Sequence, residues 1–424
     1  MAAALGVLVS CGSVKSGEEV VAASRDSKVV VAYVTSWSEV MPDPQYMTHI
    51  NYAFGHVNES FNGVKIDNEE RLRQIVDLRK QKPELKVLLS IGGWGSGRFS
   101  EMAANDEYRR AFAADCDRVV KEFALDGIDI DWEYPTSSMA NISSSPDDTE
   151  NFTLLMQDIR AAIGNEKELT LATVASARYI DFKAILPSVD FVNIMAYDMA
   201  SAPKHHSALY PSGHSGDITS DGAVTAHLKA GVPPSKLVMG MPFYGRGGDG
   251  YPSFQDYNKV GNTDTQYTEK WDEVAQVPYL ADKNDTLVFG FENPRSLAIK
   301  CQYILDKDLL GGMYWDYSGD NEQGDLRRTV AENLLGKPHK AKVLVLTERG
   351  GQHGGFTDAG LRWLAAEGAK GNFSITEINN ARNITEAYLS QFSLVIQLDF
   401  PPYTWPKEAE DAFVKYIEEG RGGW

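Results

Sequence analysis

Cysteine is scarce in this chain, which has 424 residues and only three cysteines. Three cysteines cannot form a disulfide framework, and none of them belongs to a metal-binding CxxC pair. Cys116 and Cys301 fall in helical patterns, which predicts two small buried apolar side chains. We therefore expect neither a metal ion nor another cofactor.

Positive charge is also in short supply. Lysine and arginine number 41 against 59 aspartates and glutamates, which gives a formal net charge of -18. Nucleic acids and anionic membrane surfaces are bound through lysine and arginine, so this balance argues against both as partners. It is compatible with a neutral partner such as a polysaccharide. The 43% of hydrophobic and 24% of charged residues are ordinary for a soluble globular protein.

The apolar run at the N-terminus, residues 1–9, is too short to span a bilayer. It ends in Leu8-Val9-Ser10-Cys11-Gly12, which resembles the lipobox of a bacterial lipoprotein signal. The resemblance implies lipidation of Cys11 and export to the cell envelope or beyond, with residues 1–27 as signal and tether. The membrane would then be contacted only through this anchor. Such signals usually begin with positive charge, which is missing here, so an ordinary N-terminus is the alternative.

From residue 28 onward, apolar segments typical of buried strands alternate with helical patterns. Eight such strands within residues 28–337 predict a (β/α)₈ barrel of the TIM type. A doubly wound open sheet is the alternative, but it would need a glycine-rich turn after the first strand, and none is there. The predicted strands are Lys28–Trp37, His49–Val57, Lys86–Trp94, Leu125–Pro135, Leu169–Ala175, Val189–Tyr197, Lys236–Tyr244 and Leu310–Trp315.

The fourth of these strands carries acids on one face. Side chains alternate across a strand, so Asp129, Asp131 and Glu133 share a face. Like charges this close raise the pKa of at least one member, which is what a general acid needs near neutral pH. A calcium site is the alternative, but calcium loops place their acids on a flexible loop that contains glycine. The opposite face, directed at the helices, carries Ile128, Ile130 and Trp132.

The acids stand in the pattern Asp126-x-x-Asp129-x-Asp131-x-Glu133, followed by Tyr134-Pro135. This closely resembles the signature of family 18 glycoside hydrolases, the chitinase family. Catalytic groups of a TIM barrel lie at the C-terminal strand ends, so Glu133 is well placed, and Asp126, at the other end, is expected to be structural. Shorter matches to the same family occur, in the family's order along the chain, at Ser90–Trp94, Met195–Asp198, Met241–Arg246 and Trp315.

The resemblance implies substrate-assisted catalysis, in which the substrate's acetamido group is the nucleophile and configuration is retained. Glu133 would be the general acid and later the base. Asp131 would orient the acetamido N–H, Asp129 would share a proton with Asp131, and Tyr197 would hold the acetamido oxygen. Asp198 would bind sugar hydroxyls, and Trp315 would form the apolar floor beneath the distorted sugar. Further substrate-binding candidates are Met195, Tyr33, Ser90, Trp94, Tyr134 and Arg246.

Several of these candidates have an alternative reading. Tyr33, Ser90 and Met195 lie inside a barrel in either case and could serve packing alone. Trp94 and Trp37, at strand ends, could stack on sugars or shield the site from solvent.

Chitinases with deep clefts carry an α+β insertion between the seventh and eighth strands. The segment from Arg246 to Gly311 is short and reads as a loop rich in Gly, Asp, Asn and Tyr, which predicts a shallower, more open cleft.

Residues 338–424 start a new strand–helix pattern, which predicts an open parallel sheet of the flavodoxin type. This segment resembles the trehalose-utilisation family, relatives of class I glutamine amidotransferases. No cysteine follows Cys301, so an amidotransferase nucleophile is absent. The chain stops where the next strand is expected, which suggests a partial domain, and we assign no catalysis to it.

Taken together, the sequence predicts an exported chitinase-type glycosidase, a monomer that cleaves β-1,4 bonds of N-acetylglucosamine polymers. An endo-β-N-acetylglucosaminidase acting on N-glycans is the alternative within the same fold. A non-catalytic chitin-binding lectin is the alternative outside enzymes. Such lectins typically lose the acid at the position of Glu133, which is present here.

Overall fold

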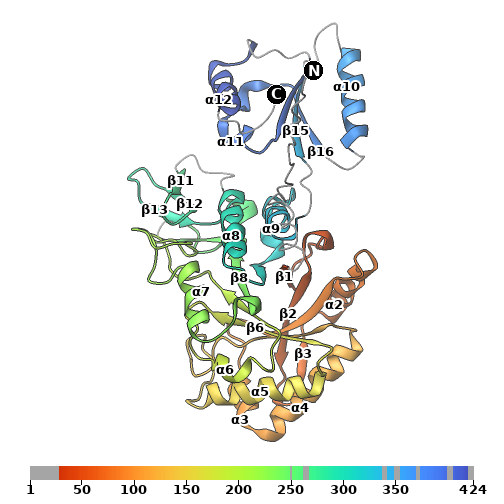
Figure 1. Cartoon of the computed structure of the whole chain (residues 1–424), viewed down its shortest axis with the longest axis vertical. Helices are drawn as coiled ribbons and strands as arrows, with labels where there is room; N and C mark the ends of the chain where they lie inside the picture. Colours follow the sequence, from red (N-terminus) through yellow and green to blue (C-terminus); the bar gives the residue numbers. More distant parts are fainter. Residues whose placement is uncertain are drawn as a thin grey trace, which may run out of the picture. The chain divides into compact units, whose positions relative to one another are not determined.

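The computed structural model describes residues 28–248, 251–260, 267–336, 341–347, 354–368, 373–398 and 404–418. The chain divides after Gly336 into two compact units. The larger unit holds the eight predicted strands, and the smaller one holds the predicted C-terminal elements (Figure 1). The predicted signal and tether, residues 1–27 with Cys11, lie outside the described residues.

The larger unit is a closed barrel of eight parallel strands, as predicted. Its strands follow the order β1-β14-β8-β7-β6-β5-β4-β2, and the pairing of β1 with β2 closes the ring. Because the first strand pairs with the last on one side and with the second on the other, the sheet closes on itself and the open-sheet alternative is wrong. The strands are β1 (Val29–Thr35), β2 (His49–Val57), β4 (Lys86–Gly92), β5 (Gly127–Asp131), β6 (Glu168–Val174), β7 (Phe191–Met195), β8 (Leu237–Pro242) and β14 (Gly311–Trp315).

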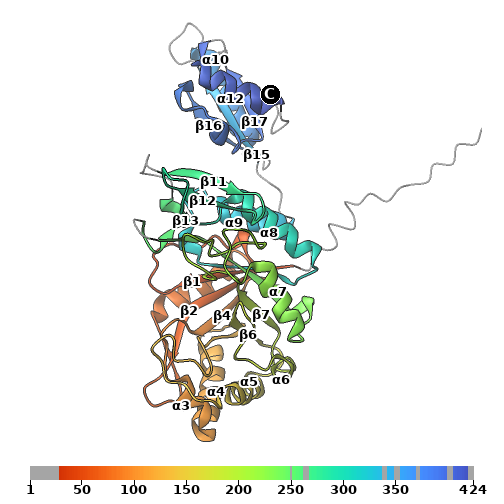
Figure 2. The same ribbon diagram turned by 90° about the vertical axis from the view of Figure 1, so that its left-hand side faces the viewer.

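Helices cover the outside of this barrel (Figures 1 and 2). Two of the longer ones begin at asparagine caps. The Asn105 side chain accepts from two N–H groups of α4, and Asn293 forms a capping box with Ser296 at the start of α8. The α-helices are α2 (Glu69–Val76), α3 (Phe99–Ala104), α4 (Asp106–Glu122), α5 (Asp148–Ile163), α6 (Phe182–Ile185), α7 (Ser220–Lys229), α8 (Pro294–Asp306) and α9 (Asp325–Leu335). Short 3-10 helices are η1 (Pro44–Tyr46), η2 (Asp77–Lys80), η3 (Pro234–Lys236), η4 (Tyr257–Lys259) and η5 (Tyr317–Gly319).

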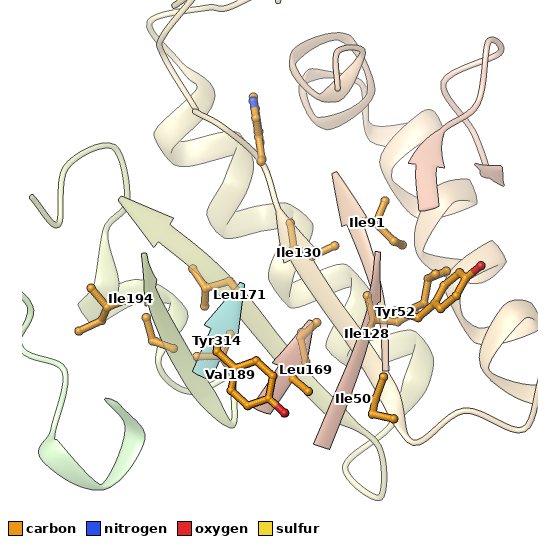
Figure 3. Close-up of a cluster of buried hydrophobic side chains, with 14 of the residues drawn as sticks. Ile50, Tyr52, Ile91, Ile128, Ile130, Leu169, Leu171, Val189, Ile194 and Tyr314 are labelled. Carbon is orange, nitrogen blue, oxygen red and sulfur yellow. The ribbon is translucent and has the colours of Figure 1, made fainter. Parts of the chain in front are cut away.

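Side-chain alternation divides the barrel into two apolar layers. The outward layer lies between strands and helices, and Figure 3 shows Ile128 and Ile130 of β5 within it. Trp132 belongs to the same layer, with 2% of its surface exposed and its ring stacked on Phe99 at 5.3 Å, so its predicted core role is confirmed. The inward layer is smaller, and its buried members are Val31, Tyr33, Ala53, Phe54, Phe191, Val238 and Met313.

The barrel unit has two groups of strands in addition to the eight barrel strands. The short strand β3 (Val64–Ile66) pairs antiparallel with the end of β2. Between β8 and α8 the chain forms an antiparallel sheet in the order β10-β9-β13-β12-β11. The expectation of a loop in this segment was therefore wrong, and the argument for an open cleft loses its basis. The strands are β9 (Tyr244–Gly247), β10 (Gln255–Asp256), β11 (Thr268–Asp272), β12 (Val277–Ala281) and β13 (Leu287–Gly290).

The smaller unit has a three-stranded parallel sheet in the order β16-β15-β17. Its strands and helices follow the order read from the sequence, whereas the flavodoxin-type fold and the family of this segment stay predictions. Cys116 and Cys301 are buried and free, as expected. No helix in the described part of the chain is long and apolar enough to cross a membrane. The elements of the unit are β15 (Ala341–Thr347), α10 (Gly354–Glu367), β16 (Phe373–Ile378), η7 (Ala381–Asn383), α11 (Glu386–Leu389), β17 (Leu394–Leu398) and α12 (Lys407–Glu418).

Candidate active site

The three acids lie on and just beyond β5, between strands β4 and β6. Asp129 and Asp131 are buried and face the barrel interior, and Glu133 follows the end of the strand. Glycine permits the close approach of the neighbouring strands. A Cβ on Gly127 would lie 2.0 Å from the carbonyl oxygen of Glu168, and a Cβ on Gly92 would lie 2.0 Å from that of Asp131. The strand that carries the acids is therefore fixed by backbone packing on both sides.

Asp129 is a hydrogen-bond acceptor shared by four other strands. Its carboxylate accepts from the hydroxyls of Tyr33 at 2.8 Å, Ser90 at 2.8 Å and Thr170 at 2.6 Å, and from the Asn193 amide at 3.3 Å. Burial raises the pKa of Asp129, and these four hydrogen bonds oppose that rise. Burial has the larger effect, so the pKa of Asp129 stays above its ordinary value, and the four donors limit the cost of a charged carboxylate inside the barrel.

Asp131 has a different environment, although it lies only two residues further along. Its Oδ1 atom is buried and has no hydrogen-bond partner among the residues that the structure describes. Burial raises the pKa of Asp131 well above its ordinary value, and the negative charges of Glu133 and Asp129 raise it further. The protonated form of Asp131 is therefore favoured, and its proton is shared within a coupled group of carboxyls. Its expected proton sharing with Asp129 stays a prediction.

Glu133 is half-buried at the C-terminal end of the barrel. Burial raises the pKa of Glu133 to about 7, a hydrogen bond with Tyr134 opposes this rise, and the charge of Asp198 adds to it. A carboxyl group with this pKa is protonated in a large fraction of molecules near neutral pH. It is therefore suited to give a proton to a leaving group and to take one back.

Asp198 follows β7 and is tied to two other segments. The Arg246 guanidinium of β9 binds both of its carboxylate oxygens, with Nε to Oδ1 at 2.7 Å. The His206 ring lies 3.4 Å from Oδ1. Burial alone would raise the pKa of Asp198, but the hydrogen bonds and charges of Arg246 and His206 outweigh it and hold the pKa far below its usual range. Asp198 thus keeps its negative charge, and the Arg246 guanidinium is paired with it.

Tyr197 brings a hydroxyl to the same place. Its side chain lies against Met313 and Tyr244, with the hydroxyl 3.8 Å from the Met313 sulfur. Burial raises the pKa of Tyr197 well above its ordinary value, as do the charges of Asp131 and Glu133. The phenol therefore stays neutral and can donate a hydrogen bond next to the two acids. Met195, the last residue of β7, belongs to the apolar lining of the barrel.

Aromatic rings gather around Trp315, the last residue of β14. Phe54 stacks on it at 5.6 Å, and Tyr33 and Trp37 lie at 5.5 and 6.5 Å. Trp37 is 64% exposed. An indole ring backed by other aromatic rings is a suitable floor for a pyranose ring.

A second aromatic group continues from the acids. Trp94 meets the ring of Tyr134 edge-on at 6.4 Å, and Tyr134 stacks on Tyr179 at 5.5 Å. Trp94 is 62% exposed, so its indole can bind a ligand. Trp37 and Trp94 are thus too exposed to be explained by packing alone.

Some contributors were missed by sequence reasoning. Thr170 and Asn193 could have been found by alternation, because both point inward from neighbouring strands. His206 and Phe254 gave no signal, since both lie in segments without periodicity. Phe254 is exposed and stacks on Tyr244 at 4.7 Å, next to Arg246.

Two further findings concern the role of Asp126 and the question of a metal ion. Asp126 accepts from Arg79 and, at 2.7 Å, from the backbone N–H of Val87, so it holds β4 and β5 together at the end away from the acids. Its expected structural role agrees with this geometry. In the described ranges, no group of histidine, cysteine and acidic side chains could hold a metal ion.

Comparison with known proteins identifies relatives of this site. The chain is 31% identical to chitotriosidase-1 of Mus musculus over 70% of this chain and 74% of the relative. It is 30% identical to chitinase A1 of Niallia circulans, of which it spans only 58%, with 71% of this chain covered. A solved N-acetylglucosaminidase of Paenibacillus barengoltzii matches 72% of this chain and all of its own, with 32% identity and a TM-score of 0.66.

The family model described as glycosyl hydrolases family 18 matches residues 29–320. This range covers the closed barrel, the sheet β9–β13 and every acid of the site. The chain therefore belongs to glycosyl hydrolase family 18.

Proposed function

We propose that this protein is a chitinase-type glycosidase that hydrolyses β-1,4 bonds next to N-acetylglucosamine units with retention of configuration. One observation carries the proposal: Glu133, with a pKa raised to about 7, lies at the end of the strand that carries the buried Asp131, and the charge of Glu133 raises the pKa of Asp131. The names of the relatives, chitinases and an N-acetylglucosaminidase, support the substrate class.

The choice of nucleophile follows from Asp198. A retaining enzyme with a carboxylate nucleophile needs a free carboxylate facing the acid. Asp198 is bound on both oxygens by Arg246 and approached by His206, so it is a poor nucleophile. Family 18 enzymes instead use the acetamido oxygen of the substrate. In our proposal this oxygen attacks the anomeric carbon while Glu133 protonates the glycosidic oxygen of the leaving group.

Asp131, Tyr197 and Trp315 would stabilise the positively charged oxazolinium intermediate, which forms when the acetamido oxygen bonds to the anomeric carbon. The free Oδ1 of Asp131 accepts the acetamido N–H, and its carboxyl gains negative charge as its proton shifts toward Asp129. The Tyr197 hydroxyl holds the acetamido oxygen, and Trp315 lies under the distorted ring. Water then attacks the anomeric carbon, the bond from this carbon to the acetamido oxygen breaks, and the Glu133 carboxylate takes a proton from the water, which restores the acid.

The test is hydrolysis of chromogenic N-acetylglucosamine oligomers by the wild type, by Glu133→Gln and by the exposed control Glu84→Gln. Removing the acid should lower kcat about 100- to 10,000-fold without unfolding the protein, because the change is nearly isosteric. The control should keep the wild-type rate. Full activity in Glu133→Gln would contradict the assignment of the acid.

The reaction products separate the remaining alternatives. Release of single N-acetylglucosamine units would indicate an exo-acting enzyme. Release of N-glycans without cleavage of chitin oligomers would support the endo-β-N-acetylglucosaminidase. Binding of oligomers without cleavage would support the lectin.

We also infer that the protein is exported and lipid-anchored. The support is the motif Leu8-Val9-Ser10-Cys11-Gly12. Incorporation of labelled palmitate in a bacterial host should occur in the wild type and be lost in Cys11→Ser.

A further inference from the structure

A tight turn carries Trp94 at the end of β4. The N–H of Gly93 donates to the carbonyl of Asp131 at 2.9 Å, and the N–H of Ser96 donates to the carbonyl of Gly93 at 2.9 Å. We call residues 93–96 the Trp94 turn. One end of it is thus attached to the strand of the catalytic acids. The indole itself is 62% exposed and meets the edge of Tyr134, so the backbone of the turn contributes to where it points.

The other end of the turn is held by a chain of polar side chains. The Ser96 hydroxyl lies 2.8 Å from Nδ1 of His56, and Nε2 of His56 lies 3.0 Å from the carboxylate of Asp67. The N–H of Asp67 donates to the carbonyl of Phe54 at 3.0 Å. Both ring nitrogens of His56 are therefore engaged, and Asp67 fixes the orientation of the imidazole.

Packing reinforces this attachment. Gly93 has a φ of +93°, and a Cβ there would lie 2.7 Å from ring atoms of Phe54. The ring of Phe54 also lies 6.2 Å from His56 and stacks on Trp315. The end of β2 thus supports the floor of the site through Phe54 and the Trp94 turn through His56.

We infer that His56, oriented by Asp67, is a positioning residue that holds the Trp94 turn so that the indole binds sugar rings away from the bond that is cleaved. This inference rests on the proposed function. His56 acts through Ser96 and Trp94 and takes no part in proton transfer. Without the Ser96–His56 hydrogen bond the turn would lose its side-chain attachment to β2, and the indole would sample orientations that do not stack on a sugar.

Substitutions in the full chain test this inference. Ser96→Ala removes the hydroxyl, and His56→Phe keeps a ring beside Phe54 but loses both hydrogen bonds. Both variants lose the hydrogen bond between Ser96 and His56, so each should raise KM for a six-unit oligomer about threefold to tenfold and leave kcat nearly unchanged. Ser96→Thr keeps the hydroxyl and should restore the wild-type KM. The exposed Ser138→Ala is the matched control and should change nothing.

A double-mutant cycle with Trp94→Ala shows whether His56 acts through the indole. Once Trp94 is removed, Ser96→Ala should add almost nothing to the loss. Effects that add fully, or a loss confined to kcat, would overturn the inference. Thermal unfolding of each variant identifies any that fail to fold, and Ser96→Ala, at a half-buried position, then carries the test without His56→Phe.

Failure of the proposed function gives a different result. In that case the wild type itself would not cleave the oligomers, whatever residue stands at position 56 or 96. Binding of the six-unit oligomer to Glu133→Gln, measured by calorimetry with and without Ser96→Ala, gives a second readout that does not need turnover. An unchanged dissociation constant in this pair would also overturn the role of His56.

Discussion

Glu133 and Asp198 show how neighbouring groups set the proton affinity of a carboxyl group. Burial raises the pKa of Glu133 to about 7, a hydrogen bond with Tyr134 opposes this rise, and the charge of Asp198 adds to it. Asp198 is also partly buried, but Arg246 binds both of its oxygens and the pKa falls instead. Two residues of the same chemistry at the same end of the barrel are thereby prepared for opposite tasks, proton donation and fixed negative charge.

This difference predicts the pH dependence of the enzyme. Glu133 must be protonated to act as the acid, so kcat/KM should fall as pH rises through about 7. The charge of Asp198 contributes to the raised pKa. Asp198→Asn should therefore shift this alkaline limb to lower pH, whatever it does to the rate at the optimum. Initial rates from pH 5 to 9 measure the shift, and the exposed control Asp217→Asn should leave the limb in place. A limb that does not move in Asp198→Asn would contradict the coupling.

At the scale of elements, the sequence was most informative where burial leaves a local pattern, either a continuous apolar run or an alternation of apolar and polar residues. The barrel strands were found because they are continuous apolar runs, and inward-facing Asp129 and Asp131 were found by alternation. The sheet β9–β13 was missed because its strands are short, down to Gln255–Asp256, and rich in residues typical of loops. Its stability comes from pairing between distant segments, which no local pattern reveals. The contacts of Arg246 with Asp198 and of Ser96 with His56 were missed for the same reason, because each joins residues that are far apart in the sequence.

The backbone packing around β5 gives a prediction at this scale. A Cβ on Gly127 would lie 2.0 Å from the Glu168 carbonyl oxygen, so β5 and β6 would have to separate. Gly127→Ala should lower the free energy of unfolding by about 3 kcal/mol, the upper end of what overpacking costs. Urea unfolding measures this change. Gly213→Ala, where a Cβ meets no atom within 4 Å, is the control and should be neutral. Equal stability of the two variants would disprove the steric argument.

At the scale of the whole molecule, the two units differ in what they contribute to catalysis. The family match ends at residue 320, and the smaller unit begins only after Gly336. Every residue assigned to the chemistry lies in the barrel unit, whose last helix, α9, packs on α8 and β1. The barrel unit has its own core and a closed ring of strands, so it has what a domain needs to fold alone.

A fragment of residues 28–336 should therefore hydrolyse chitin oligomers with the kcat/KM of the full chain. Steady-state kinetics of the two proteins on the same soluble oligomer measures this directly. A much lower kcat/KM in a fragment that is folded by circular dichroism would show that the smaller unit takes part in catalysis.

The four hydrogen bonds that converge on Asp129 have a consequence for how such a protein can change over evolutionary time. Asp129 connects β5 to β1, β4, β6 and β7 from inside, so its loss would leave buried hydroxyls and an amide without an acceptor. Glu133 lies beyond the strand and joins no strands together. A lineage that abandons hydrolysis but keeps sugar binding can therefore replace Glu133 at little structural cost, while the inner aspartate persists as a remnant of the lost reaction.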